Sequence, residues 1–224
     1  MKNLYAFLFT CSLFGVVQAQ EMSLDINGNK NLEAINVITA NASYKGKSAL
    51  TVTDPGGNSE AKFLKINGLN FKNGIIEVDL AGDLAPGSKE QARGFVGIAF
   101  SINDDNSKFE CIYLRPTNGR AEDQVRRNHA VQYISYPDFP WFKLRKESPE
   151  KYETYVDLVP GEWTKVKIEI KDKTARLFVH GNDQPTLIVN ELLGEPKAGA
   201  IGLWIGPGTE AHFSNLVITN KSND

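Results

Sequence analysis

The stretch 94–115, GFVGIAFSINDDNSKFECIYLR, contains the pattern of two β-strands joined by a turn. One face of its first half carries large apolar residues, namely Val96, Ile98, Phe100 and Ile102. The opposite face is mostly small and leaves room above the sheet, with Phe95, Gly97, Ala99 and Ser101. The polar run 103–106 has the composition of a hairpin turn, and 109–115 is expected to return as the paired strand. This alternation predicts an antiparallel pair with a core-facing side.

The same period of two residues recurs along the chain. Further strands are expected at 75–80, 163–170, 175–180, 200–205 and 211–219. Gly, Pro, Asn and Asp separate them, and no segment sustains a helical period of normal length. We therefore expect an all-β fold, a two-sheet antiparallel sandwich. If Ile201, Leu203 and Ile205 are the core set of their strand, Trp204 lines the opposite face.

The first 19 residues have the pattern of a secretory signal peptide. Lys2 supplies a positive charge, 4–17 is apolar, and small residues precede a cut near Ala19/Gln20. The apolar run is short for a stable membrane span, and no second span follows it. We therefore expect a secreted or periplasmic protein with a single domain at 20–224, long enough to bury a full core.

The charge of the chain bears on its partners, and its cysteine content bears on disulfide bonding. The formal net charge is −2, and the basic pair Arg126-Arg127 is interleaved with acidic residues. A basic footprint for nucleic acid is therefore absent, and no nucleic-acid partner is expected. Once the signal peptide with Cys11 is removed, Cys111 has no internal disulfide partner, which is compatible with export as a disulfide-free protein.

Several of these segments together carry a family pattern. They are Gly94-Phe95-Val96-Gly97-Ile98-Ala99-Phe100, Phe109-x-x-x-Tyr113-Leu114-Arg115, Gly161-x-Trp163-x-x-Val166 and Gly199-x-Ile201-Gly202-Leu203-Trp204. The chain resembles the concanavalin A-like, laminin-G-type jelly-roll superfamily. Its members include lectins, carbohydrate-binding modules, glucanases and proteins similar to 3-keto-disaccharide hydrolases. The resemblance implies a jelly roll with a carbohydrate ligand on its concave sheet, although one fold hosts many activities.

One catalytic pattern of this superfamily is incomplete here. Glucanases similar to laminarinases carry two catalytic glutamates on a Glu-x-Asp-x-(x)-Glu strand. Glu77-Val78-Asp79 begins such a string, but Ala81 and Gly82 stand where the last glutamate would be. We therefore exclude this motif and interpret Glu77 and Asp79 as the solvated face of a strand.

A long insertion at about 117–157 lies outside the general fold pattern. It is rich in arginine, carboxylates and aromatic residues. Sugar sites combine flat aromatic walls with a few convergent polar groups, and arginine favours carboxylates in particular. The predicted ligand-binding residues are Arg115, Arg126, His129, Tyr133, Tyr136 and Trp141. Alternatively, the aromatic residues pin the insertion to the sheet and its ion pairs lock it in place.

The insertion also contains candidates for acid–base catalysis. His129 is its single histidine, and Asp138 and Glu153 are carboxylates of the same segment. Such a histidine acts as a general base in some enzymes, although it is also a common structural residue. Three hypotheses stay open: a carbohydrate-binding protein of a bacterial glycan-utilisation system, a hydrolase or lyase similar to 3-keto-disaccharide hydrolases, and a non-catalytic module that binds another protein.

No cofactor is expected from the sequence. No His/Cys cluster has the spacing of a zinc site. The pair Asp104-Asp105 is compatible with a structural calcium ion, which jelly rolls of the resembled type often carry. Adjacent aspartates in a hairpin are also ordinary turn residues.

Overall fold

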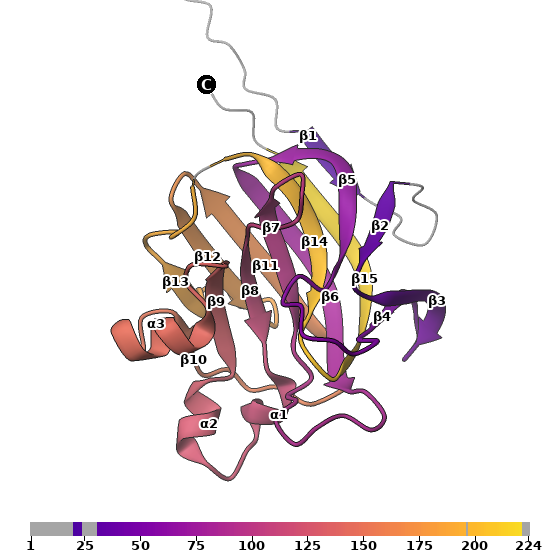
Figure 1. Ribbon diagram of the computed structural model, residues 1–224, viewed down its shortest axis with the longest axis vertical. Coiled ribbons are helices and arrows are strands. Elements are labelled where there is room, and N and C mark those ends of the chain that lie inside the picture. The colour runs from indigo at the N-terminus through magenta and orange to yellow at the C-terminus, as the bar shows by residue number, and fades with distance from the viewer. Residues whose placement is uncertain (1–19, 24–30, 196, 221–224) are drawn as a thin grey trace, which may run out of the picture.

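The computed structural model describes residues 20–23, 31–195 and 197–220, so the expected signal peptide at 1–19 lies outside the described residues. Two antiparallel sheets face each other, and short helices lie at one side of the molecule (Figure 1). The expected two-sheet antiparallel sandwich is therefore confirmed.

The first sheet has eight strands. Along the sheet they are β13 (Leu187–Val189), β12 (Thr174–Val179), β11 (Thr164–Lys171), β6 (Gly74–Leu84), β15 (Thr209–Asn220), β4 (Lys47–Thr53) and β3 (Ile38–Tyr44), with β1 (Gln20–Ser23) paired to β15. The sheet buries one face: in β11, Val166, Ile168 and Ile170 are buried and alternate with more exposed residues. This confirms the period-two prediction for the strand.

The second sheet has seven strands. Along the sheet they are β10 (Glu153–Thr154), β9 (Val131–Tyr136), β8 (Phe109–Leu114), β7 (Val96–Ile102), β14 (Gly199–Ile205), β5 (Phe63–Phe71) and β2 (Leu32–Ile35). The predicted hairpin is present as β7 and β8, with Ile98 opposite Ile112. Every residue of β8 is buried, so both faces of this sheet are covered.

The segment 117–157 is built into the sandwich more closely than expected. It begins within α1 (Pro116–Gly119) and contains α2 (Gln124–Asn128) and α3 (Trp141–Glu147). It also supplies β9 and β10, and β9 pairs with β8 along its whole length. The segment therefore extends the second sheet, because the backbone of β9 hydrogen-bonds to the edge of β8.

The helices are all short. Within the described ranges the longest is α3, with seven residues, and no helix there is long and apolar enough to cross a membrane.

Candidate functional site

A cavity of about 890 Å³ opens on the outer face of the seven-stranded sheet, which we call the cavity face. Its floor is formed by Tyr113 of β8 and Trp204 of β14, whose ring centroids are 4.8 Å apart. Gly97 of β7 lies in register between them. A Cβ at Gly97 would lie 2.3 Å from the carbonyl oxygen of Ile112. The missing side chain therefore lets the two rings meet over the strand.

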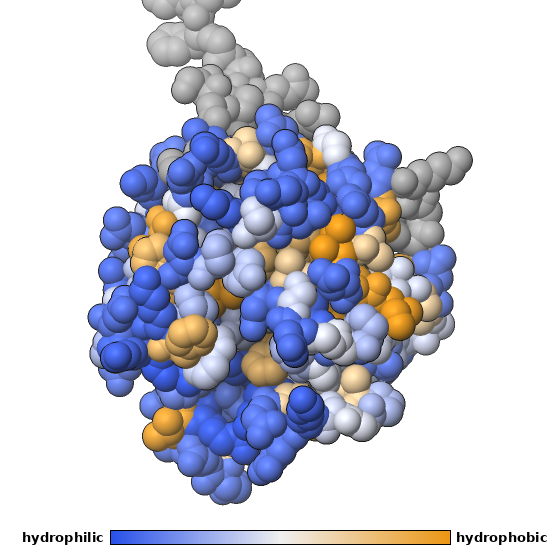
Figure 2. Space-filling model, in the orientation of Figure 1, coloured by the Kyte–Doolittle hydropathy of each residue, from blue (hydrophilic) through white to orange (hydrophobic). Residues whose placement is uncertain are grey.

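This floor follows from the alternation of the flanking strands. Ile201, Leu203 and Ile205 are fully buried on the interior face, so Trp204 turns the other way, as the sequence predicted. The indole Nε1–H of Trp204 donates to the carbonyl oxygen of Glu60 at 3.0 Å and so holds one wall loop against the floor. The remaining walls come from 85–95, 118–129, 141–145 and 207–208. Figure 2 shows this side of the molecule, where hydrophilic residues, in blue, surround paler residues of intermediate hydropathy.

Aromatic rings fill the neighbouring part of the same face. Phe63 and Phe109 meet edge to face at 5.5 Å, and the ring of Tyr136 stacks on Phe109 at 5.0 Å. Tyr136 is therefore not among the cavity-lining residues. This placement corrects the expectation that Tyr136 lines the site, because β9 directs its ring over Phe109 and away from the opening. For this residue the structure matches the alternative, in which the aromatic residues pin the segment to the sheet.

Arg115 is the most deeply buried charged residue of the cavity lining. Arg115 comes directly after β8 in the sequence, and it is 5% exposed. The guanidinium donates to the carbonyl oxygen of His129 at 2.9 Å, to the hydroxyl oxygen of Tyr113 at 3.0 Å and to Gln132 Oε1 at 3.3 Å. Burial raises the pKa of Tyr113 to about 12, so its hydroxyl stays protonated at neutral pH. These contacts hold Arg115 in one orientation before any ligand arrives.

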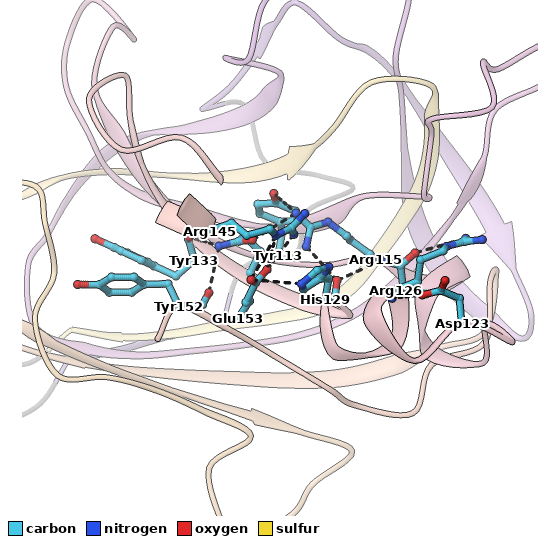
Figure 3. A network of polar contacts seen from close by, with 11 residues as sticks. Tyr113, Arg115, Asp123, Arg126, His129, Tyr133, Arg145, Tyr152 and Glu153 are labelled. Carbon is cyan, nitrogen blue, oxygen red and sulfur yellow. Dashed lines mark hydrogen bonds and ion pairs between the residues drawn. The ribbon is translucent and has the colours of Figure 1, made fainter. Parts of the chain in front are cut away.

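A second polar group lies beside it (Figure 3). Glu153 of β10 accepts hydrogen bonds from Arg145 of α3 on both carboxylate oxygens, the shortest at 2.8 Å. His129 Nε2 lies 3.4 Å from Glu153 Oε1. Burial lowers the pKa of His129, although the charge of Glu153 acts in the opposite direction. The guanidinium of Arg145 also lies 4.9 Å from the ring of Trp141, which is 40% exposed at the rim.

Tyr133 points to the other side of the sheet. Its side chain is fully buried, and its hydroxyl donates to Glu110 Oε1 at 2.6 Å and accepts from the backbone N–H of Leu193 at 2.7 Å. Figure 3 shows its ring directed away from Arg115 and His129. The expectation that Tyr133 lines the site is therefore corrected. Successive residues of a strand face opposite ways, and Gln132 takes the cavity face, opposite Tyr113.

The other predicted residues divide between the cavity and the surface. Arg126 of α2 lines the cavity, as do His129 and Trp141. The side chain of Asp123 accepts from the backbone N–H of Arg126 and begins this helix. Asp138 is exposed and does not line the cavity. Whether these residues bind a ligand or act in catalysis stays a prediction.

Other lining residues come from outside the insertion and were not predicted. They include Glu60, Arg93 and Phe95. Glu60 and Arg93 lie in loops. In a loop, no alternation of residues in the sequence indicates which way a side chain points. Tyr113 could have been found, because it is the large residue that alternation places beside Gly97 and Ala99.

The geometry of the Asp104-Asp105 turn does not favour calcium. The ammonium of Lys65 donates to the carbonyl oxygens of Asn103 and Asp104 and to Asn106 Oδ1 at 2.8 Å. Asp105 Oδ1 accepts from the backbone and side chain of Ser107. In the described part of the chain no group of three or more His, Cys, Asp or Glu side chains could hold a metal ion. Several oxygens of this turn are thus already bonded within the protein, and a structural calcium ion stays a prediction.

Comparisons with known proteins identify the fold. No family model matches the chain, and no curated protein matches it. Among solved structures, a carbohydrate-binding module, CBM66, from Bacillus subtilis superposes with a TM-score of 0.54 at 13% identity, covering 86% of this chain and 96% of that one. A protein of unknown function with a galectin-like fold, also from Bacillus subtilis, gives 0.56 at 10% identity, covering 92% and 100%.

A putative glycosyl hydrolase from Parabacteroides distasonis gives a TM-score of 0.52 at 14% identity, covering 89% of this chain and 98% of that one. Identities this low are evidence of the fold alone. Together with the two antiparallel sheets, they show that the chain has a jelly-roll sandwich fold like that of these structures.

Proposed function

We propose that this chain is an exported protein that binds carbohydrate in the cavity over Tyr113 and Trp204. The observation that carries the proposal is the aromatic floor between polar walls, next to an arginine that three protein acceptors already orient. Aromatic surface packs against the C–H face of a sugar ring, and fixed donors meet its hydroxyls. The expected signal peptide at 1–19 supports export, and a bacterial glycan-utilisation system is the setting we infer.

A binding measurement tests this proposal. The chain from Gln20 onward would be titrated with a broad panel of oligosaccharides by calorimetry. We expect at least one ligand whose affinity falls about tenfold in Trp141→Ala, because this ring lies at the rim of the cavity. The matched control is Phe142→Ala, which removes the neighbouring aromatic residue of α3, itself 61% exposed and not part of the lining. Equal loss in both variants, or no ligand in the panel, contradicts the proposal.

An enzyme similar to 3-keto-disaccharide hydrolases is the second candidate. The observation that favours it is His129 Nε2 at 3.4 Å from Glu153 Oε1, beside the cavity. The carboxylates among the lining residues are Asp54 and Glu60. Asp54 is held by Lys62 at 2.7 Å, whereas burial raises the pKa of Glu60, as suits a general acid. Glycoside hydrolysis ordinarily needs two carboxyl groups. The carboxylate of Asp54 is already in an ion pair with Lys62, so we rank the enzyme second.

The enzyme hypothesis has a separate readout. The same panel, extended with 3-keto sugars, would be incubated with the chain and analysed by mass spectrometry. A product that disappears in both His129→Gln and Glu60→Gln would replace the binding proposal. A partner protein stays a prediction.

A further inference from the structure

Positive charge concentrates in the cavity although the whole chain has a net charge of −2. Arg93, Arg115 and Arg126 all line it, each from a different segment. In the described residues none of the three has a carboxylate within ion-pair distance, whereas Arg120 and Arg145 each have one. The three arginines form what we call the arginine group.

Arg115 is the member for which this absence is most informative. Exposed arginines need no partner because water solvates them, but a guanidinium that is 5% exposed is ordinarily paired with an anion. Its acceptors are neutral: a backbone carbonyl, a tyrosine hydroxyl and a glutamine amide. These bonds use three of the five N–H donors of a guanidinium. Among the described residues, the guanidinium of Arg115 therefore has no carboxylate within ion-pair distance.

The members of the arginine group are linked to one another. Arg115 and Asn118 both donate to the carbonyl oxygen of His129, and Arg126 Nη2 donates to Asn118 Oδ1 at 3.5 Å. Burial lowers the pKa of Arg93, and the positive charges of Arg126 and Arg115 lower it further, although the charge of Glu90 acts in the opposite direction. Its Nη1 donates to backbone carbonyl oxygens of its own loop. Three like charges are thus held together, and an anion between them would relieve their repulsion.

The acidic residues of the lining do not neutralise this group. The carboxylate of Asp54 accepts from Lys62 and from the backbone N–H groups of Gly56 and Gly208. Burial raises the pKa of Glu60 and so favours its uncharged form. Lys89 adds a further cation to the lining. The charge of the cavity is therefore complementary to an anionic ligand.

We propose that the cavity selects an anionic sugar, whose carboxylate or sulfate ester is bound by the arginine group while its ring packs against the Tyr113–Trp204 floor. Planar guanidinium groups bind carboxylates and sulfates through paired N–H donors, which explains why arginine is used here. This inference rests on the proposed carbohydrate-binding function and specifies the class of sugar.

Matched ligand pairs test the inference separately from the proposed function. Each acidic oligosaccharide would be titrated beside its neutral counterpart: oligogalacturonate against its methyl ester, and a sulfated galactan against the desulfated form. We expect binding of one acidic member at least tenfold tighter than that of its neutral counterpart, with an affinity that falls as salt is raised. Which pair shows the difference identifies the anion as carboxylate or sulfate.

The two failures differ. Equal affinity for acidic and neutral members contradicts the anionic selectivity and leaves the carbohydrate-binding proposal intact. No binding by any member of these pairs contradicts the anionic selectivity, and binding of another sugar in the broad panel would then leave the carbohydrate-binding proposal intact.

Two substitutions at neighbouring positions then test whether the anionic group of the sugar lies at Arg126. Arg126→Gln should reduce affinity for the acidic member about tenfold and change that for the neutral member little. The control is Arg127→Gln on the same helix, because Arg127 donates to the hydroxyl oxygen of Tyr155 at 2.9 Å and does not line the cavity. Both substitutions lie on the partly solvated helix α2, so we expect the melting temperature to stay unchanged. An equal effect of both, or of neither, overturns the assignment.

Discussion

Two buried carboxylates lie on opposite faces of the same edge of the seven-stranded sheet. Glu110 is 3% exposed on the interior face, and Glu153 is 7% exposed on the cavity face. Among the described residues, Glu110 accepts only from neutral donors, the hydroxyl of Tyr133 and the backbone N–H of Gly194. Glu153 meets a bidentate arginine and a histidine. Equal burial thus coexists with different electrostatics, and the partners decide which carboxylate belongs to a charged site.

The largest expected effect is on the cavity face. Arg145→Met removes the cationic partner of Glu153 and leaves a buried carboxylate beside a histidine whose pKa is lowered. We expect the free energy of unfolding to fall by about 3 kcal/mol, the lower end of the range for buried pairs, because Glu153 is buried whereas Arg145 is 31% exposed. Urea unfolding measures this loss. Lys146→Met, at the exposed neighbouring position, is the control, and a similar small change in both would show that the pair is not stabilised by burial.

A substitution on the interior face should lower the free energy of unfolding by less. Tyr133→Phe removes a hydroxyl that both donates to Glu110 and accepts from Leu193. The expected cost is about 1–3 kcal/mol, with ligand binding in the cavity unchanged because Tyr133 faces away from it.

Tyr136→Phe is the matched control for this substitution. No hydrogen bond of the Tyr136 hydroxyl is found among the described residues, and its ring stacking with Phe109 would be kept. A loss of ligand affinity in Tyr133→Phe without a loss in Tyr136→Phe would mean that the two faces are coupled, against the comparison drawn here.

The third effect is the pH dependence of the interior face. Burial raises the pKa of Glu110 above its ordinary 4.5, so the folded state binds this proton more tightly than the unfolded state. The contribution to stability is therefore present below pH 4.5 and is lost as pH rises through the folded pKa. Glu110→Gln should remove this decline. Urea unfolding from pH 4 upward checks it, and identical slopes in both proteins would refute it.

The smallest effect should have the opposite sign. Burial lowers the pKa of His129 below its ordinary 6.5, and the charge of Glu153 offsets part of that shift. The unfolded state then binds more protons, so stability is lost as pH falls from 6.5 through the folded pKa. His129→Gln should weaken this loss. Stability curves between pH 5 and pH 8 test the difference, and a steeper loss in the variant would count against it.

Much of the fold could be predicted from the sequence, because the alternation of core-facing and outward-facing residues is visible within each strand. The pattern of 94–115 predicted β7, β8 and the turn between them, and their observed register has Ile98 opposite Ile112. The side of Trp204 was also predictable once Ile201, Leu203 and Ile205 were taken as core. In β7, large apolar residues alternate with small ones, so the sequence itself shows which residues face the core.

The direction of Tyr133 was not readable in the same way. β9 is buried along nearly its whole length, so Val131, Gln132 and Tyr133 show no polar alternation in burial. Pairing with β8 decides the matter: Gln132 lies opposite Tyr113 on the cavity face, and Tyr133 lies opposite Ile112 on the interior face. A one-residue shift in that register would exchange the two.

By itself, the amino-acid sequence determined the sandwich, the small residues that leave room over β7 and the arginine-rich composition near the site. The tertiary structure alone decided which charges are neutralised. Arg145 forms an ion pair with Glu153, whereas the hydrogen bonds of Arg115 within the described residues go to neutral acceptors. The physical reason is that hydrophobic periodicity is written into neighbouring residues. The pairing of charges depends instead on distances between segments that only folding brings together.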